Sequence, residues 1–232
     1  MSSNTVKLVI DGKEIFAGPE DTLFEAARKK IPALCSVLDG LSGYGGCRLC
    51  LVETKGSGRL LPSCTTPVSE GLEIVTSSDR LTRYRRWVVE LLLAERTHIC
   101  SVCMANGSCE LQDVATKLGV DHLRVARFWS GLEVDLTHER FAYDPNRCVL
   151  CTRCVRVCDE IEGVHTLDLM KRGKDEKVIF DMDEKWGSAP SCTSCGKCSA
   201  VCPVGAIYVK GKPLSEVKKK DLVSFIRQRR QR

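Results

Sequence analysis

Residues 148–158 of the chain read CVLCTRCVRVC, and residues 192–203 read CTSCGKCSAVCP. In both segments two, two and then three residues separate successive cysteines. Cysteine thiolates at this spacing, ending in Cys-Pro, are typical ligands of [4Fe–4S] clusters. Paired C-x2-C also suits tetrahedral zinc, so a pair of zinc sites is the alternative. The repeat predicts two metal centres in this part of the chain.

The repeat also predicts how the eight cysteines are shared. In bacterial two-cluster ferredoxins, three cysteines of each run bind one cluster and the fourth binds the other cluster. We therefore expect one [4Fe–4S] cluster at Cys148, Cys151, Cys154 and Cys202, and another at Cys192, Cys195, Cys198 and Cys158. Because neither run completes a site alone, the two halves should fold together and hold their clusters close enough for electron exchange.

The composition favours a reducing compartment. The 232 residues include 15 cysteines, an odd number that clusters in C-x2-C pairs, which argues against a disulfide framework. The N-terminal residues do not combine a cationic region with an apolar stretch, so we expect no secretory signal. Glu90 interrupts the best apolar run, Trp87 to Ala94, and we expect no membrane span. A cytoplasmic location fits these features.

The charge is concentrated at the C-terminus. The formal net charge is +5, and residues 211–232 form a basic tail whose surplus accounts for it. The rest of the chain is close to neutral, so the overall charge does not predict a nucleic-acid-binding protein. The tail itself could be a solvated end, a helix that docks on a partner, or a nucleic-acid-binding arm.

Residues 1–78 have the element order of a plant-type ferredoxin, a β-grasp fold. Two strands, Val6–Ile10 and Glu14–Phe16, flank a two-residue turn and predict a hairpin. Thr22 or Asp21 should cap a helix that runs through Lys30. Two further strands are expected at Leu49–Thr54 and Glu73–Thr76.

Four cysteines in this segment predict a [2Fe–2S] site. Three come from one region and one from further along the chain, as in the plant-type layout, although the first gap is eleven residues rather than four. The candidate ligands are Cys35, Cys47, Cys50 and Cys64. The glycine-rich loop 40–46 should let the backbone curl around the cluster. Because that loop lacks G-x-G-x-x-G and leads into cysteines, a nucleotide site is not expected.

Residues 79–137 predict a helical segment with a third kind of site. From Asp79 apolar residues recur at helical spacing, and the arginines beside them are expected on a solvated or partner-facing side. The pattern H-x-C-x2-C-x5-C then offers four ligands: His98, Cys100, Cys103 and Cys109. A helix from Glu110 to Leu118 should end at Gly119. We favour a His-ligated [4Fe–4S] cluster, with a Cys3His zinc site as the alternative.

The predicted architecture is α+β, with metal centres in three modules. These are a plant-type-like [2Fe–2S] ferredoxin domain at 1–78, a helical His/Cys3 [4Fe–4S] domain at 79–137, and a two-[4Fe–4S] ferredoxin-like domain at 138–210, followed by the tail at 211–232. An insertion with hairpin character, Val164–Arg172 and Lys177–Asp181, separates the two cysteine runs. His122, His138 and His165 lie outside any ligand spacing and are expected to be surface or core residues.

Two segments resemble a known family. Residues Gly46–Glu53 and Cys100–Gln112 are similar to the N-terminal part of the large iron–sulfur subunit of respiratory complex I. They resemble still more the small diaphorase subunit of cytoplasmic NAD-reducing [NiFe] hydrogenases. The chain ends about 30 residues after Cys202, which favours the hydrogenase subunit. One position departs from the wider family, which usually places its ligand histidine four residues before Cys100, where this chain has Arg96.

The resemblance implies an electron-transfer subunit with one [2Fe–2S] and three [4Fe–4S] clusters and no catalytic site of its own. Its partners would be a flavin/NAD-binding diaphorase subunit and the hydrogenase small and large subunits, which would hold the FMN, NAD and Ni–Fe groups. One alternative is an electron-input subunit of a formate dehydrogenase or of a complex I-like NADH dehydrogenase. An alternative from another class is an iron–sulfur or zinc structural module of a nucleic-acid enzyme.

Overall fold

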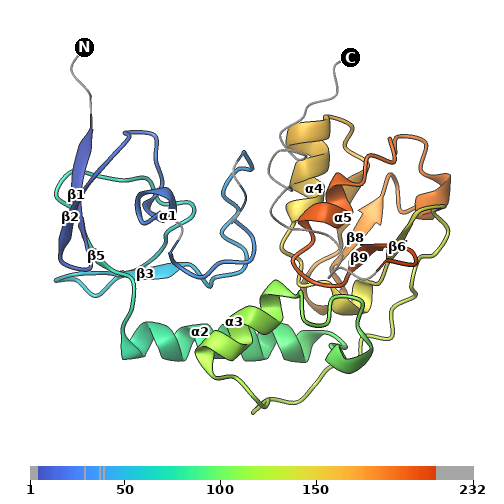
Figure 1. Cartoon of the computed structure of the whole chain (residues 1–232), viewed down its shortest axis with the longest axis horizontal. Helices are drawn as coiled ribbons and strands as arrows, with labels where there is room; N and C mark the ends of the chain where they lie inside the picture. The colour runs from blue at the N-terminus through green and yellow to red at the C-terminus, as the bar shows by residue number, and fades with distance from the viewer. Residues whose placement is uncertain (1–4, 29, 37, 39, 213–232) are drawn as a thin grey trace. The chain divides into compact units, whose positions relative to one another are not determined.

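The computed structural model describes residues 5–212 except 29, 37 and 39 (Figure 1). The described residues form two compact units, and the division falls inside one helix, between Val88 and Val89. The first unit comprises residues up to 37 and residues 43–88, and the second comprises 38–42 and the residues from 89 onward. The module boundaries at 78/79 and 137/138 stay predictions. Most of the basic tail, residues 213–232, lies outside the described residues.

The first unit contains a five-stranded mixed sheet in the order β2-β1-β5-β3-β4. The hairpin of β1 (Val6–Ile10) and β2 (Lys13–Ala17) is antiparallel, and β5 (Glu73–Val75) pairs parallel with β1. The strand β3 (Leu51–Thr54) is antiparallel to both β5 and β4 (Leu60–Pro62). This arrangement is the predicted β-grasp fold. The sequence did not predict β4, because glycines and a proline mark that segment as a loop.

The predicted first helix is much shorter in the structure. Thr22 caps α1 (Leu23–Ala26) with the expected capping box, in which the Thr22 and Glu25 side chains each accept the other's backbone N–H. The helix stops at Ala27, however, and Arg28 follows with a positive φ of 51°, so the prediction that it runs through Lys30 is wrong. The left-handed conformation at Arg28 ends the helical hydrogen bonding before Pro32 is reached.

The helix α2 (Asp79–Glu95) begins in the first unit and carries the arginine run. Most of these arginines are exposed or half-buried, as predicted, but Arg85 is only 5% exposed. Its guanidinium donates to the carbonyls of Leu49, Leu51 and Thr76 at 2.9–3.1 Å. Arg85 is therefore a correction to the solvated-face prediction. It joins the helix to the backbone on both sides of Cys50, where β3 begins, and to the residue that follows β5.

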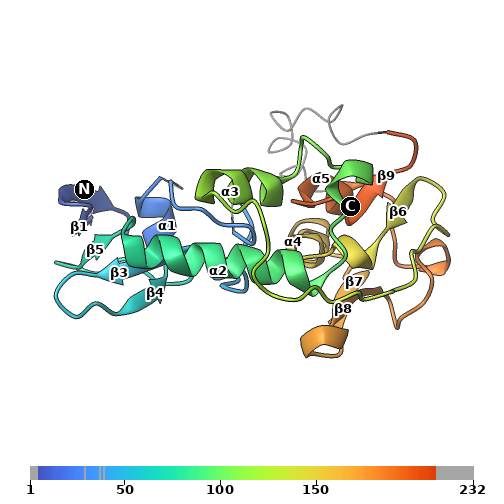
Figure 2. The same ribbon diagram turned by 90° about the horizontal axis from the view of Figure 1, so that it is seen from below.

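The second unit is built from short elements. The helix α3 (Glu110–Leu118) ends at Gly119, as predicted, with a φ of 65°. Two small antiparallel sheets pair β6 (Phe141–Tyr143) with β9 (Ile207–Val209), and β7 (Leu167–Met170) with β8 (Lys177–Phe180). The β7–β8 pair confirms the predicted hairpin between the cysteine runs, and β7 lies beside α4 (Arg153–Arg156) (Figure 2). No helix in the described residues is long and apolar enough to cross a bilayer.

An aromatic stack forms the core of the second unit. Trp186 is 1% exposed and stacks on Phe180 at 4.6 Å between ring centroids and on Phe141 at 5.5 Å. Tyr143 meets Phe180 edge-on. The buried Cys154, Cys158 and Cys198 belong to the same apolar cluster. The aromatic core is therefore continuous with the walls of the cysteine sites.

Candidate iron–sulfur sites

The structure gathers the four cysteines predicted to bind a [2Fe–2S] cluster. Their thiols form two close pairs, Cys35 with Cys47 and Cys50 with Cys64, with 3.3 Å between sulfurs in each pair, and all four residues are buried. Hydrogen bonds with Cys35 raise the pKa values of Cys47 and Cys64, and the hydrogen bond with Cys64 lowers the pKa of Cys50 to about 6. Four thiolates this close would repel one another, so the donor set fits a cationic iron–sulfur core.

The glycine-rich loop approaches this site at one defined point. A Cβ atom added to Gly43 would lie 2.1 Å from the carbonyl oxygen of Cys64, a distance that no side chain tolerates. The backbone N–H of Leu34 donates to the Cys47 sulfur at 3.4 Å. Close backbone packing and N–H···S contacts are the features expected around a cluster. Gly43 therefore brings this loop against the Cys64 backbone, and the curl of the loop around a cluster stays a prediction.

The second unit divides its eight C-terminal cysteines into two groups. Cys202 interacts electrostatically with Cys148, Cys151 and Cys154, which belong to the other run. Cys158 lines a pocket together with Cys192, Cys195 and Cys198, again across the runs. Burial, with repulsion from neighbouring thiols, raises the pKa values of Cys148 and Cys151 to about 12 and about 11. These thiols would therefore ionise at neutral pH only against a metal centre.

The local backbone explains how each run presents its thiols. In the first run, Leu150 and Thr152 have φ values of 49° and 59°, and a short helix, α4, then carries Cys154. In the second, Ser194 and Gly196 have φ values of 54° and 78°, and α5 (Lys197–Val201) carries Cys198. A π-helical turn, Val157–Glu162, holds Cys158. Left-handed residues between the cysteines bend each loop so that successive thiols face one centre.

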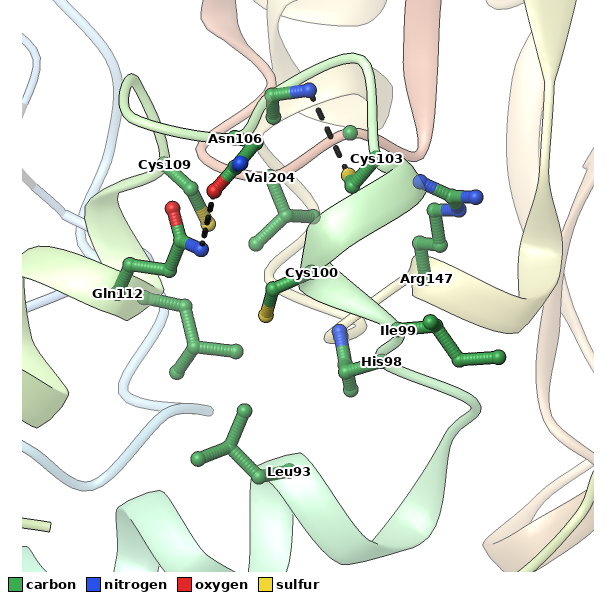
Figure 3. A pocket seen from close by; sticks show the side chains of 13 residues that line it. Leu93, His98, Ile99, Cys100, Cys103, Asn106, Cys109, Gln112, Arg147 and Val204 are labelled. Atoms are coloured by element: carbon green, nitrogen blue, oxygen red, sulfur yellow. Dashed lines mark hydrogen bonds between the residues drawn. The ribbon is translucent and has the colours of Figure 1, made fainter. Parts of the chain in front are cut away.

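The third predicted site lies in a pocket of the second unit. His98, Cys100, Cys103 and Cys109 all line it, together with Leu93 and Val204 (Figure 3). The backbone N–H of Ala105 donates to the Cys103 sulfur at 3.5 Å. Within the described residues, no three His, Cys, Asp or Glu side chains surround a single-ion position. The structure brings all four predicted metal ligands to one pocket. That they bind a cluster stays a prediction.

His98 has the chemical form of a metal ligand. Burial lowers the pKa of His98 to about 4, so its imidazole is neutral at physiological pH. Its buried Nε2 has no hydrogen-bond partner among the described residues. A hydrogen bond with the Leu92 backbone opposes part of this pKa shift. A histidine ligand commonly uses one nitrogen for the metal while a backbone group orients the other.

Arg96, at the position where the resemblance places a histidine, lies elsewhere. Its side chain is 1% exposed, and its Nη2 donates to the carbonyl of Glu176 at the start of the β7–β8 hairpin's second strand. Arg96 is absent from the lining of the His98 pocket. Arg96 departs from the family pattern in the sequence, but no local sequence feature indicates that its side chain is buried.

The His98 pocket and the first cysteine run share a boundary. Glu110, which follows Cys109, forms a bidentate ion pair with the buried Arg153 at 2.8 and 2.9 Å. The Glu110 backbone N–H also donates to the Pro203 carbonyl at 2.9 Å. A Cβ added to Gly205 would lie 2.6 Å from the Cys103 sulfur. The chain segments that carry the predicted ligands of these two clusters are therefore in direct contact.

Trp186 is a site residue that the sequence did not reveal. Its indole Nε1 donates to the sulfur of Cys192 at 3.3 Å. A hydrogen bond of this kind to a ligand sulfur changes the reduction potential of a cluster. The contact depends on the aromatic stack, and tryptophan carries no spacing signal that could have identified it.

Family models match the three parts of the chain in order. Residues 3–79 match the 2Fe-2S iron-sulfur cluster binding domain, and residues 85–124 match the NADH-ubiquinone oxidoreductase-G iron-sulfur binding region. Residues 140–208 match the ferredoxin-like domain of NADH-quinone oxidoreductase subunit 3. The chain therefore contains domains that bind [2Fe–2S] and [4Fe–4S] clusters.

A solved structure gives a match over the length of both chains. A chain in the crystal structure of NAD+-reducing [NiFe]-hydrogenase in the H2-reduced state superposes with a TM-score of 0.84 at 33% identity, covering 90% of this chain and 89% of that one. This chain belongs to the iron–sulfur subunit family of NAD(P)-linked hydrogenases and complex I-like oxidoreductases. Membership in this family makes it an electron-transfer component of an oxidoreductase.

Curated relatives give similar identities over only part of their length. NADPH-Fe(3+) oxidoreductase subunit alpha of Geobacter sulfurreducens is 36% identical over 88% of this chain. NADP-reducing hydrogenase subunit HndD of Solidesulfovibrio fructosivorans is 34% identical over 86% of this chain. The alignments span 24% and 35% of those two relatives, so the chain corresponds to about a quarter to a third of their length.

Proposed function

We propose that this chain carries electrons through one [2Fe–2S] and three [4Fe–4S] clusters between a [NiFe] hydrogenase module and an FMN- and NAD-binding diaphorase subunit. The ligands would be the sixteen residues predicted from the sequence, including His98. The complete complex would couple H2 oxidation to NAD+ reduction in the cytoplasm. The chain itself would hold no catalytic site.

The observation that carries this proposal is the direct contact between the loops of two predicted cluster sites. Glu110 joins Arg153 and Pro203, and Gly205 lies against Cys103. A structural zinc knot needs no such junction with a neighbouring redox site, whereas electron transfer requires neighbouring centres. The match to a hydrogenase structure over nearly the whole of both chains supports the hydrogenase assignment.

The residues of the chain would prepare these sites rather than react themselves. Iron–sulfur clusters, when bound, accept and donate single electrons at potentials set by charge, hydrogen bonding and solvent exposure. Buried cysteines and a neutral His98 would supply the ligands. N–H groups of Leu34, Ala105 and Leu150 donate to ligand sulfurs and would stabilise their negative charge.

The first test is a metal analysis of the protein purified without oxygen. One [2Fe–2S] and three [4Fe–4S] clusters predict about 14 irons and about 14 sulfides per chain, with no zinc. About 10 irons with one zinc would assign the His98 pocket to zinc and remove one cluster from the proposal. Mostly zinc with little iron would end the electron-transfer proposal.

The terminal donor needs a separate test, because the relatives named above catalyse different reactions. Co-purified nickel and H2-dependent reduction of NAD+ by the complex would support the hydrogenase assignment. Molybdenum with formate-dependent NAD+ reduction would assign the chain to a formate dehydrogenase. Neither metal, with NADH oxidation alone, would favour a complex I-like NADH dehydrogenase.

A further inference from the structure

Arg96 is a buried cation that forms no ion pair with the residues that the structure describes. It is 1% exposed and among the largest fully buried side chains. One of its nitrogens, Nη2, donates to the Glu176 carbonyl, whereas the buried Nε and Nη1 have no hydrogen-bond partner among the described residues. An arginine stays protonated at all physiological pH values, so burying it without a negative partner is costly.

Arg153, Arg156 and Lys197 are also buried in this unit. Arg156 donates to the Thr152 hydroxyl and to the carbonyls of Ser42 and Cys151, whereas the other two cations have carboxylate partners. Arg153 is paired with Glu110, and Lys197 is paired with Glu162. Both pairs lie beside cysteine runs, and each cation directly precedes the third cysteine of its run. Arg96 has no carboxylate partner of this kind among the described residues. It also differs from Arg85, which donates to three carbonyls, because Arg96 donates to one. A counter-charge of another type would offset its burial.

The surroundings of Arg96 identify that counter-charge. The Glu176 carbonyl that anchors it lies two residues before Val178, whose N–H donates to the Tyr143 hydroxyl at 3.3 Å. Tyr143 belongs to the buried cluster against which Cys148, the first cysteine of the first run, packs. Burial raises the pKa values of Cys148 and Tyr143, and the charge of Arg96 opposes this rise in both. The guanidinium is therefore close enough to act on the first cysteine of the first run.

We propose that Arg96 is the buried counter-cation of the cluster bound by Cys148, Cys151, Cys154 and Cys202, and that it raises the reduction potential of that cluster. The inference rests on the proposed function, which assigns these ligands. A cluster held by four thiolates is negatively charged, and one-electron reduction makes it more so. A fixed positive charge in a medium of low dielectric constant stabilises the reduced form more than the oxidised form.

The position of Arg96 would also give the clusters of the two cysteine runs different reduction potentials. Arg96 comes from the end of the segment that leads to His98, and its charge acts on Cys148, the first cysteine of the first run. The effect should therefore be larger at the cluster of the first run. Because the guanidinium keeps its proton, no proton uptake should accompany the electron through this group.

The test compares three variants of the full chain in its purified complex. Arg96→Gln removes the charge and keeps an N–H donor for Glu176, whereas Arg96→Lys keeps the charge. Arg172→Gln is the matched control, because this substitution removes the same charge at an exposed position between β7 and β8. Iron and sulfide content and the midpoint potential of each reduced cluster, followed by EPR, are measured together. The signal altered in a Cys148→Ser variant identifies the relevant cluster.

We expect full cluster content in all three variants and a lower potential in Arg96→Gln alone. The expected change is roughly tenfold in the redox equilibrium constant, which for one electron corresponds to about 59 mV. Arg96→Lys should recover most of the shift. An unchanged potential in fully loaded Arg96→Gln would overturn the inference and leave the proposed function intact.

Loss of the cluster is also informative. If Arg96→Gln lost about four irons and Arg96→Lys retained them, the site would require the charge, as proposed. If both variants lost the cluster, the side-chain shape would be the requirement and the inference would fail. Low iron in the unmodified protein would contradict the proposed function instead, so the two failures are distinguishable.

Discussion

The two cysteine runs of the second unit are close copies with different neighbours. Both use left-handed residues between their first cysteines, both continue into a short helix, and both place a buried cation before the third cysteine. The acidic partners differ in origin. Glu110, which pairs with Arg153, comes from the segment after Cys109, whereas Glu162, which pairs with Lys197, comes from the π-helical turn that ends the first run.

The comparison shows how a repeated sequence can produce two unequal sites. The spacing supplies equal ligand sets, and residues outside the runs then supply unequal charges and hydrogen bonds. The first run is joined to the segment of the His98 pocket by the Glu110–Arg153 pair, and the second run receives the indole N–H of Trp186. Since the potential of a cluster depends on charge and hydrogen bonding around it, the two clusters should differ in potential.

The largest expected effect concerns the exchange of ligands between runs. Cys158→Ser should remove or convert the cluster grouped with Cys192, and Cys202→Ser should do the same to the cluster grouped with Cys148. Each variant should lose up to about four irons per chain. EPR and iron analysis of both variants check this. Loss of the Cys148 cluster alone from Cys158→Ser would show that each run completes its own site.

The two buried ion pairs should respond unequally to removal of the cation. Glu162 is 0% exposed in its side chain and Glu110 is 27% exposed. Lys197→Met should therefore destabilise the protein by about 3–5 kcal/mol, because a buried carboxylate loses its cationic partner. Arg153→Met should cost less, about 1.5–3 kcal/mol, because water can still solvate Glu110.

Urea midpoints followed by cluster absorbance, together with the rate of cluster loss, measure this difference. Lys185→Met is the control, since Lys185 forms an exposed pair with Glu133 and should change stability little. Adding Glu162→Gln to Lys197→Met should recover part of the loss. Equal destabilisation by the two methionine variants would contradict the difference in burial.

Local sequence patterns predicted the parts of the fold that depend on neighbouring residues. The capping box at Thr22, the end of α3 at Gly119 and the β1–β2 hairpin follow from residues a few positions apart. The spacing of the cysteines likewise predicted which thiols the structure would bring together. The ligand assignments themselves, including that of His98, stay predictions.

Long-range contacts explain what the sequence did not predict. Arg85 contacts carbonyls 34 and 36 residues away, and Arg96 contacts a carbonyl 80 residues away. Arginine is an ordinary surface residue in a helical pattern, so nothing local indicated that either side chain is buried. The early end of α1 depends on the backbone conformation of Arg28, which no residue preference at that position indicates.

A smaller effect should appear in the pH dependence of stability near the second run. Burial, with repulsion from Arg140 and Lys210, lowers the pKa of His138 below its usual 6.5, against weaker attraction from Glu139 and Asp135. The unfolded chain then binds a proton on His138 at higher pH than the folded chain does. His138 should support stability fully above about pH 6.5 and lose this contribution as the pH falls.

Denaturation of His138→Gln between pH 7.5 and pH 5, a range set by the histidine pKa, should show a smaller loss of stability than the unmodified protein shows. His138 Nε2 lies 3.1 Å from the Ser194 hydroxyl, so the variant also tests whether this contact supports the second run. Identical pH profiles for the two proteins would exclude His138 as the group responsible.

The smallest expected effect separates the runs through one hydrogen bond. Trp186→Phe removes the Nε1–H that donates to the Cys192 sulfur and keeps an aromatic ring for stacking on Phe180 and Phe141. The negative charge on a ligand sulfur then loses one donor, so the potential of the second-run cluster should fall by less than Arg96→Gln lowers that of the first. Redox titration followed by EPR on both variants tests the order of the two shifts. If Trp186→Phe moved the first-run potential instead, the assignment of Cys192 to the second cluster would be wrong, because its sulfur is the atom that the indole contacts.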